Sequence, residues 1–188
     1  MTTIKKFEEK YRADVQHICL ETGPGDSFTN PRVGDYILST YCNYYLDNEA
    51  ENCFVLVDED IDKAVGYILC CSDFKKYENG IKKYFKSFSE AGFSNAMECR
   101  GELLAHKLFS LNYPAHLHIN LNENYRNGGN GTKLIQTLLE ELKAKDVKGI
   151  SLICDYSNKG AIKFYKKNGF SAGLNMFFKG FLMVRKIK

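Results

Sequence analysis

The segment from Ala115 to Leu142 restricts the possible folds of this chain more than any other part of its sequence. Leu117, Ile119 and Leu121 alternate with polar residues, which is the two-residue period of a half-buried strand. Residues 124–133, NYRNGGNGTK, come next and carry three glycines. Apolar residues at the spacing of an amphipathic helix then follow, namely Leu134, Ile135, Leu138, Leu139 and Leu142. The sequence therefore predicts a strand that passes through a glycine-rich loop into a helix.

The rest of the chain alternates between helical and strand patterns. Apolar periodicity predicts helices over 11–22, 35–46 and about 158–167. Residues rich in β-branched and aromatic side chains predict strands over 53–57, 64–70, 149–154, 170–173 and 176–186. The first two of these strands flank an acidic turn and form an antiparallel hairpin. Residues 73–112 carry two helical stripes. A strand, loop, helix and strand in succession make a βαβ unit inside a mixed sheet.

The size and charge of the chain exclude several classes of protein. With 188 residues, 44% of them apolar, the chain is long enough for one domain with a packed core, which we assign to residues 1–188. The formal net charge of +3 is too balanced for a protein that binds nucleic acid mainly through phosphate neutralisation. The lysines within 73–112 are expected on a solvated helix face. We therefore expect no nucleic-acid partner.

The cysteines and the first residues bear on the location of the protein. Seven cysteines, an odd number without any Cys-x-x-Cys pair, lie among apolar neighbours, so they are predicted to be reduced core residues and not disulfides or zinc ligands. The segment from Met1 to Glu8 lacks the apolar run of a signal peptide, and no run approaches ~18 apolar residues. These features predict a cytoplasmic protein with no membrane partner.

The glycine-rich loop is a candidate anion-binding site. A loop between a strand end and a helix start directs backbone N–H groups toward a ligand at the positive end of the helix dipole. A Walker loop requires Gly-Lys-Ser/Thr, whereas Gly131 is followed by Thr132-Lys133. A dinucleotide loop requires a last glycine where Leu134 stands. The spacing excludes both of these phosphate loops and leaves a glycine-rich turn or another anion cradle.

Two motifs together resemble a known family. Arg126-x-x-Gly129-x-Gly131 is similar to the acetyl-CoA pyrophosphate loop of the GCN5-related N-acetyltransferase (GNAT) superfamily, and 158–170, NKGAIKFYKKNGF, is similar to its second signature. The resemblance covers about 115–173. It implies a mixed α/β (α+β) three-layer fold, with a twisted, mostly antiparallel central sheet of about six or seven strands flanked by helices. Residues 73–112 would then be a helical insertion.

The resemblance implies a cofactor-binding set. The backbone amides of the loop would hold the pyrophosphate of acetyl-CoA, namely Asn127, Gly128, Gly129, Asn130, Gly131 and Thr132. Arg126 would brace the loop or reach phosphate. Unpaired backbone groups at Asn120, Leu121 and Asn122 would pair with pantetheine where the strand diverges from 149–154. Asn158 would cap its helix, bind pantetheine, or do both, and Lys167 would meet the 3′-phosphate or solvent.

The resemblance also implies a catalytic set. Tyr165 matches the family's general acid: a phenol with a pKa near ~10 stays protonated at neutral pH and can donate to a thiolate of pKa near ~8.5. The same tyrosine could instead be a core aromatic. The general base is open between His118, His116, Asp73 and water. The His-x-His spacing has no third ligand nearby in the sequence, so no metal is expected.

The implied activity is transfer of an acetyl group from acetyl-CoA to a primary amine of a small molecule or peptide by direct attack. A noncatalytic acyl-CoA-binding or regulatory module is the alternative. The acceptor amine is not encoded in any motif, and monomer and homodimer are both open. Residues 115–121, AHLHINL, also bear a looser likeness to acetyltransferase-like domains that accompany O-GlcNAc-processing glycosidases.

Overall fold

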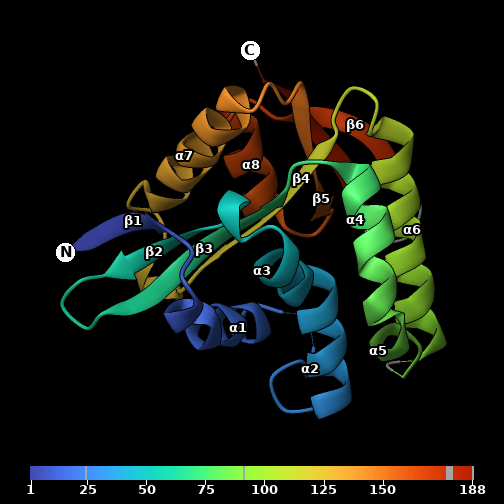
Figure 1. The fold of residues 1–188 in the computed structure, drawn as a ribbon, viewed down its shortest axis with the longest axis horizontal. Coiled ribbons are helices and arrows are strands. Elements are labelled where there is room, and N and C mark those ends of the chain that lie inside the picture. Colours follow the sequence, from blue (N-terminus) through green and yellow to red (C-terminus); the bar gives the residue numbers. More distant parts are fainter. Residues whose placement is uncertain (24, 91, 177–179, 188) are drawn as a thin grey trace.

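A seven-stranded sheet forms the centre of the molecule in the computed structural model, which describes residues 1–23, 25–90, 92–176 and 180–187 (Figure 1). Its order is β1-β2-β3-β4-β5-β7-β6, and only the pair β4 and β5 is parallel. The strands are β1 Thr2–Lys6, β2 Phe54–Asp58, β3 Lys63–Cys71, β4 Ala115–Leu121, β5 Gly149–Asp155, β6 Ser171–Met176 and β7 Gly180–Lys186. The predicted mixed, mostly antiparallel sheet is confirmed.

Helices cover both faces of this sheet (Figure 1). One face carries α1 Arg12–Glu21, α2 Pro31–Leu38, α3 Tyr44–Asn48, α4 Phe74–Gly80, α5 Phe85–Glu90 and α6 Phe93–Phe109. The other face carries α7 Asn130–Ala144 and α8 Lys159–Lys167. The alternation within β2 explains the two layers: Val55 and Val57 pack toward α1 and α3, while Phe54 and Leu56 pack toward α7.

Most predicted elements are found, with some different boundaries. The helix predicted over 11–22, the hairpin and the strand at 149–154 are confirmed as α1, β2–β3 and β5. Helices α4, α5 and α6 occupy most of 73–112. The two final strands were placed wrongly at their junction, because residue 176 belongs to β6 and β7 begins at Gly180. Residues 177–179 of the predicted last strand lie outside the described residues.

The helix predicted over 35–46 begins earlier and contains a wider turn. Pro31 starts α2 because its fixed φ suits the first helical position, and the side chain of Asn30 accepts a hydrogen bond from the Arg32 N–H at 3.2 Å. A π-helical turn at Ser39–Asn43 then leads directly into α3. Tyr44 and Tyr45 follow this turn and are both fully buried.

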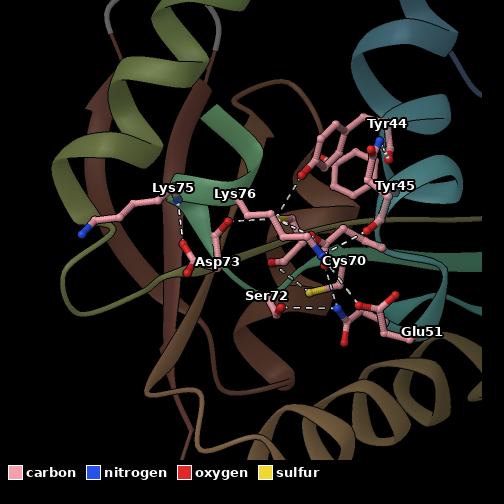
Figure 2. Close-up of polar contacts among 12 residues, drawn as sticks. Tyr44, Tyr45, Glu51, Cys70, Ser72, Asp73, Lys75 and Lys76 are labelled. Atoms are coloured by element: carbon pink, nitrogen blue, oxygen red, sulfur yellow. Dashed lines mark hydrogen bonds and ion pairs between the residues drawn. The ribbon is translucent and has the colours of Figure 1, made fainter. Parts of the chain in front are cut away.

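A buried polar cluster holds the start of α4 against the end of α3. Glu49 is fully buried, accepts a hydrogen bond from Asn52 Nδ2 at 2.8 Å and pairs with Lys76 Nζ at 2.9 Å. Figure 2 shows Lys76 reaching from α4 toward this cluster, beside Cys70. All seven cysteines are free and buried, as the sequence predicts. Because an unpaired buried charge is costly, this cluster fixes where the helical insertion leaves the sheet.

The two parallel strands diverge soon after they meet. β4 and β5 each contain seven residues, but only Ala115 with Ile150 and His116 with Ser151 are paired. The remaining residues of β4 are paired with β3 alone. The sheet therefore opens into a fork, whose apex is His116 and Ser151, and the glycine-rich loop follows the open end.

Candidate functional site

A cavity of about 980 Å³ lies at the open end of the fork between β4 and β5. The end of β4, the glycine-rich loop, the start of α7 and one side of α8 line it. Most of the predicted site residues lie on its wall, namely Asn120, Leu121, Asn122, Arg126, Asn127, Gly129, Gly131, Thr132, Asn158, Tyr165 and Lys167. The structure thus brings the two sequence signatures onto one surface.

The loop presents backbone N–H groups to this cavity. Gly129 occupies the N-cap position of α7 with a left-handed φ of 82°, and Asn127 is also left-handed at 63°. Because Gly129 has no side chain to cap the helix, the first N–H groups of α7 stay available for a ligand. An anion placed there would also meet the positive end of the helix dipole.

Close packing explains the other glycine of the motif. A Cβ added to Gly131 would lie 3.0 Å from Cζ of Phe164 on α8. A side chain at residue 131 would therefore press on Phe164 where the start of α7 packs against α8. Arg126 braces the same loop, since its Nε donates to the Leu121 carbonyl at 2.9 Å.

The backbone of β4 corrects part of the predicted pantetheine site. The Asn122 N–H donates to the Val65 carbonyl at 2.9 Å, so Asn122 directs its backbone groups to β3. In an antiparallel pair this direction alternates, so Asn120 also faces β3, while Ile119 and Leu121 face the fork. The expectation that Asn120 and Asn122 offer unpaired backbone groups to the fork is therefore not met, and the backbone groups of Ile119 and Leu121 face the fork instead.

Two residues of the second signature lie on α8. Asn158 caps this helix, because its Oδ1 accepts from the Ala161 N–H at 2.9 Å, as expected from propensity. Tyr165 is partly buried beside Phe164 and Phe170, and burial raises the pKa of its phenol above the ordinary value. Tyr165 therefore stays protonated at neutral pH, and it forms part of the cavity wall.

The acetyltransferase (GNAT) family model matches residues 20–170, most of the chain. The chain belongs to the GNAT family. No curated protein matches it significantly. Among solved structures, SsHAT matches with a TM-score of 0.83 and 22% identity over 100% of this chain and 98% of that one. PH1933 from Pyrococcus horikoshii OT3 matches at 0.66 and 20%, covering 100% and 99%.

A third GNAT-fold structure was solved with coenzyme A. The PaiA N-acetyltransferase from Thermoplasma acidophilum matches with a TM-score of 0.64 and 14% identity, covering 99% of both chains. At these identities the structural matches show the shared fold. The likeness to domains that accompany O-GlcNAc-processing glycosidases stays a prediction, as do the cytoplasmic location, the oligomeric state and the lack of a nucleic-acid partner.

Three predicted residues of this GNAT chain do not line the cavity as the described residues define it: His118, Gly128 and Asn130. Asn130 instead donates through Nδ2 to the Tyr125 carbonyl at 3.0 Å. His118 is partly buried against Tyr45, and its Nε2 lies 3.0 Å from the Tyr45 hydroxyl. Burial lowers the pKa of His118 to about 4. Such an imidazole is a weak base, so the environment disfavours the predicted role.

The other two predicted bases, His116 and Asp73, do not line the cavity either, as the described residues define it. His116 is buried, and its Nε2 lies 2.9 Å from the Tyr45 hydroxyl. Asp73 caps α4 by accepting from the Lys75 N–H at 2.7 Å (Figure 2). It follows β3 close to the His116 end of β4, whereas the loop follows the other end, roughly 20 Å along the strand. Asp73 is therefore distant from the cavity.

The sequence analysis missed several lining residues: Glu21, Thr22, Ile119, Glu123, Gly160, Ala161, Lys163 and Phe164. Those on α8 fall on the helix face that also carries Tyr165, so helical spacing contained the signal. Glu21 and Thr22 lie at the end of α1, and nothing local in the sequence indicates that they line this cavity. Within the described part of the chain, no group of three or more metal-ligating side chains is found. No described helix is long and apolar enough to span a bilayer.

Proposed function

We propose that this protein is an acetyl-CoA-dependent N-acetyltransferase that acts on a primary amine of a small molecule or peptide. The observation that carries the proposal is one cavity that joins an uncapped helix start, an open strand edge and a protonated tyrosine. The neighbour named as an N-acetyltransferase in complex with coenzyme A supports the cosubstrate. A further neighbour, the ribosomal-protein-S18-alanine N-acetyltransferase from Escherichia coli, with a TM-score of 0.57, supports transfer to nitrogen.

The residues present fit a diphosphate followed by a flexible amide chain. The first N–H groups of α7 would hold the diphosphate, and a Cβ at Gly131 would disturb this cradle through Phe164. The fork-facing backbone of Ile119 and Leu121 would pair with the amides of pantetheine. Lys163 and Lys167 line the same cavity and would meet the remaining phosphate. The thioester of acetyl-CoA supplies the activated acetyl group.

Tyr165 would serve as the proton donor for the departing thiol. Tyr165 forms part of the cavity wall, and its raised pKa keeps the phenol protonated at neutral pH, so that it can donate to the departing thiolate. The matching position in the second signature supports this role. Tyr165 also packs against Phe164 and Phe170, so it holds a fixed orientation.

The proton of the attacking amine would leave to water and not to His118. A general base works best when its pKa lies near the working pH, and the pKa of His118 is about 4. Glu21 and Thr22 line the same cavity, and their polar side chains would orient a cationic or polar acceptor there.

Two measurements test the proposal. Calorimetry with acetyl-CoA should show saturable binding, and an absence of heat at millimolar ligand would reject it. Detection of free CoA over a panel of polyamines, amino acids, aminoglycosides and peptides should then show turnover for at least one class. Binding of acetyl-CoA without turnover of any amine would favour the alternative, a noncatalytic acyl-CoA-binding module.

A further inference from the structure

Tyr125 connects the glycine-rich loop to the hairpin of β2 and β3. It closes a short 3-10 turn, Glu123–Tyr125, which leads from β4 into the loop. Its hydroxyl donates to Oδ2 of Asp58, the last residue of β2, at 2.6 Å. This hydrogen bond joins residues 67 positions apart in the sequence, and both side chains are partly buried. A side chain therefore ties the turn before the loop to the sheet.

The backbone of the same tyrosine contacts both ends of the loop. Its carbonyl accepts a hydrogen bond from Nδ2 of Asn130, the first residue of α7, at 3.0 Å. Its N–H donates to the carbonyl of Asn122, which directly follows β4, at 3.0 Å. Only residues 126–129 lie between Tyr125 and Asn130. The position of Tyr125 therefore restrains the short segment that precedes α7.

Asp58 is well suited to hold the Tyr125 hydroxyl. The side chain of Asp58 is 15% exposed, and its Oδ1 accepts from the Asp60 N–H at 3.1 Å, which orients the carboxylate. The hydrogen bond from Tyr125 lowers the pKa of Asp58 below its ordinary value, so the group is charged at neutral pH. Hydrogen bonds to an ionised acceptor are shorter and stronger than those between neutral groups. The contact is therefore one of the stronger restraints on the loop.

We propose that Asp58 and Tyr125 are positioning residues, which hold the glycine-rich loop so that the first N–H groups of α7 are in place before a diphosphate binds. Neither residue lines the cavity as the described part of the chain defines it, so both act through the loop. A loop that is already ordered loses less conformational entropy on binding, and this raises affinity. The diphosphate as ligand rests on the proposed function, whereas the restraint on the loop is a property of the unliganded protein.

The first test is backbone ¹⁵N relaxation of the protein without ligand. In the wild type the amides of residues 127–130 should have order parameters near ~0.85, the value of a rigid backbone, and Tyr125→Phe should lower them toward ~0.6. The amides of β5 should not change. Loop amides that are already mobile in the wild type, or that stay equally rigid in Tyr125→Phe, would overturn the inference.

Tyr84→Phe is the matched control. Tyr84 lies in the insertion between β3 and β4, and its hydroxyl likewise donates to an aspartate, Oδ2 of Asp47, at 2.5 Å. This variant also removes one oxygen and keeps the ring, and it should leave the loop rigid. Equal loosening of the loop in both variants would mean a global effect and would contradict the inference. Asp58→Asn keeps an acceptor oxygen, so its loop should be more rigid than that of Asp58→Ala.

The second test separates the diphosphate from the rest of the cosubstrate. In calorimetry Tyr125→Phe should weaken acetyl-CoA binding by about tenfold, as expected for the loss of one hydrogen bond to a charged group. Binding of S-acetylpantetheine, which lacks the diphosphate, should change less than about twofold. Equal weakening of both ligands would contradict a role at the diphosphate. If the wild type binds neither ligand, the proposed function fails, and the relaxation data alone still decide whether Asp58 and Tyr125 restrain the loop.

Discussion

The buried histidines make the stability of this protein sensitive to mild acid. Burial lowers the pKa of His106 to about 3 and that of His118 to about 4, and it lowers the pKa of His116 in the same direction. In the unfolded chain each imidazole titrates near ~6.5. Below this pH the unfolded chain therefore binds protons that the folded protein does not bind. The stability that neutral histidines allow is complete above pH ~6.5 and is lost as the pH falls toward ~4.

The size of this effect follows from the distance between the pH and the unfolded pKa. At pH 5 the difference is about 1.5 units, which at about 1.36 kcal/mol per unit gives about 2 kcal/mol for each histidine. His106 and His118 together contribute about 4 kcal/mol, and His116 adds to this. A domain is commonly stable by about 5–15 kcal/mol, so the loss is a large part of the total.

Urea unfolding followed by circular dichroism between pH 7.5 and 5 measures this loss. Between pH 6 and 5 the slope of the unfolding free energy should correspond to about two to three protons taken up on unfolding. His118→Gln should reduce it by about one. His17→Gln is the control, because His17 is exposed on α1 against Phe28, apart from the three buried histidines. A wild-type slope near zero would refute the conclusion that these three histidines are neutral in the folded protein.

The cofactor site leads to three further predictions. Gly129→Ala should weaken acetyl-CoA binding in calorimetry by about tenfold, since a left-handed residue with a side chain costs about 1–2 kcal/mol. Gly128→Ala is the control and should bind nearly as the wild type does, because its Cβ would meet only Asn130 Nδ2 at 3.8 Å. Tyr165→Phe should lower kcat by about 100-fold or more with unchanged acetyl-CoA affinity, and unchanged turnover would remove Tyr165 from catalysis. Asn158→Asp should keep the α8 cap and the melting temperature. It should weaken acetyl-CoA binding, because it removes the amide donor and adds a negative charge. An unchanged affinity would mean that Asn158 serves only as the helix cap.

The sequence predicts those parts of the fold in which neighbouring residues carry the signal. Strand β4 was located within a residue, and the predicted apolar stripe from Leu134 to Leu142 lies inside helix α7, because alternation and helical spacing are local patterns. The start of α2 was missed although Asn30-Pro31 is a good N-cap with proline at the first helical position. The π-helical turn at Ser39–Asn43 could not be predicted, since it depends on how Tyr44 and Tyr45 pack against the sheet.

The candidate site, too, was predicted only where neighbouring residues carry the signal. The loop and α8 were predicted because their glycines, asparagine and tyrosine occupy fixed spacings in two short motifs. The surroundings of His118 could not be predicted, because the Tyr45 hydroxyl that contacts its Nε2 lies 73 positions away in the sequence. Backbone pairing was misjudged by one residue, and in a strand such a shift exchanges the two edges. Spacing alone therefore located most of the cavity wall but did not reveal the surroundings of the histidines.

The insertion between β3 and β4 packs against the buried histidines at the apex of the fork. Tyr77 on α4 packs edge-on to His116 with the ring centroids 4.3 Å apart, and His106 on α6 lies 4.6 Å from His116. His106 also contacts Ser151 on β5, the other side of the apex. The insertion therefore covers the apex of the fork and keeps these histidines neutral by excluding water. On the proposed function the two signature motifs would hold only the cosubstrate side, so differences in acceptor among related chains should follow the residues that contact His116 and His118 from α3, α4 and α6.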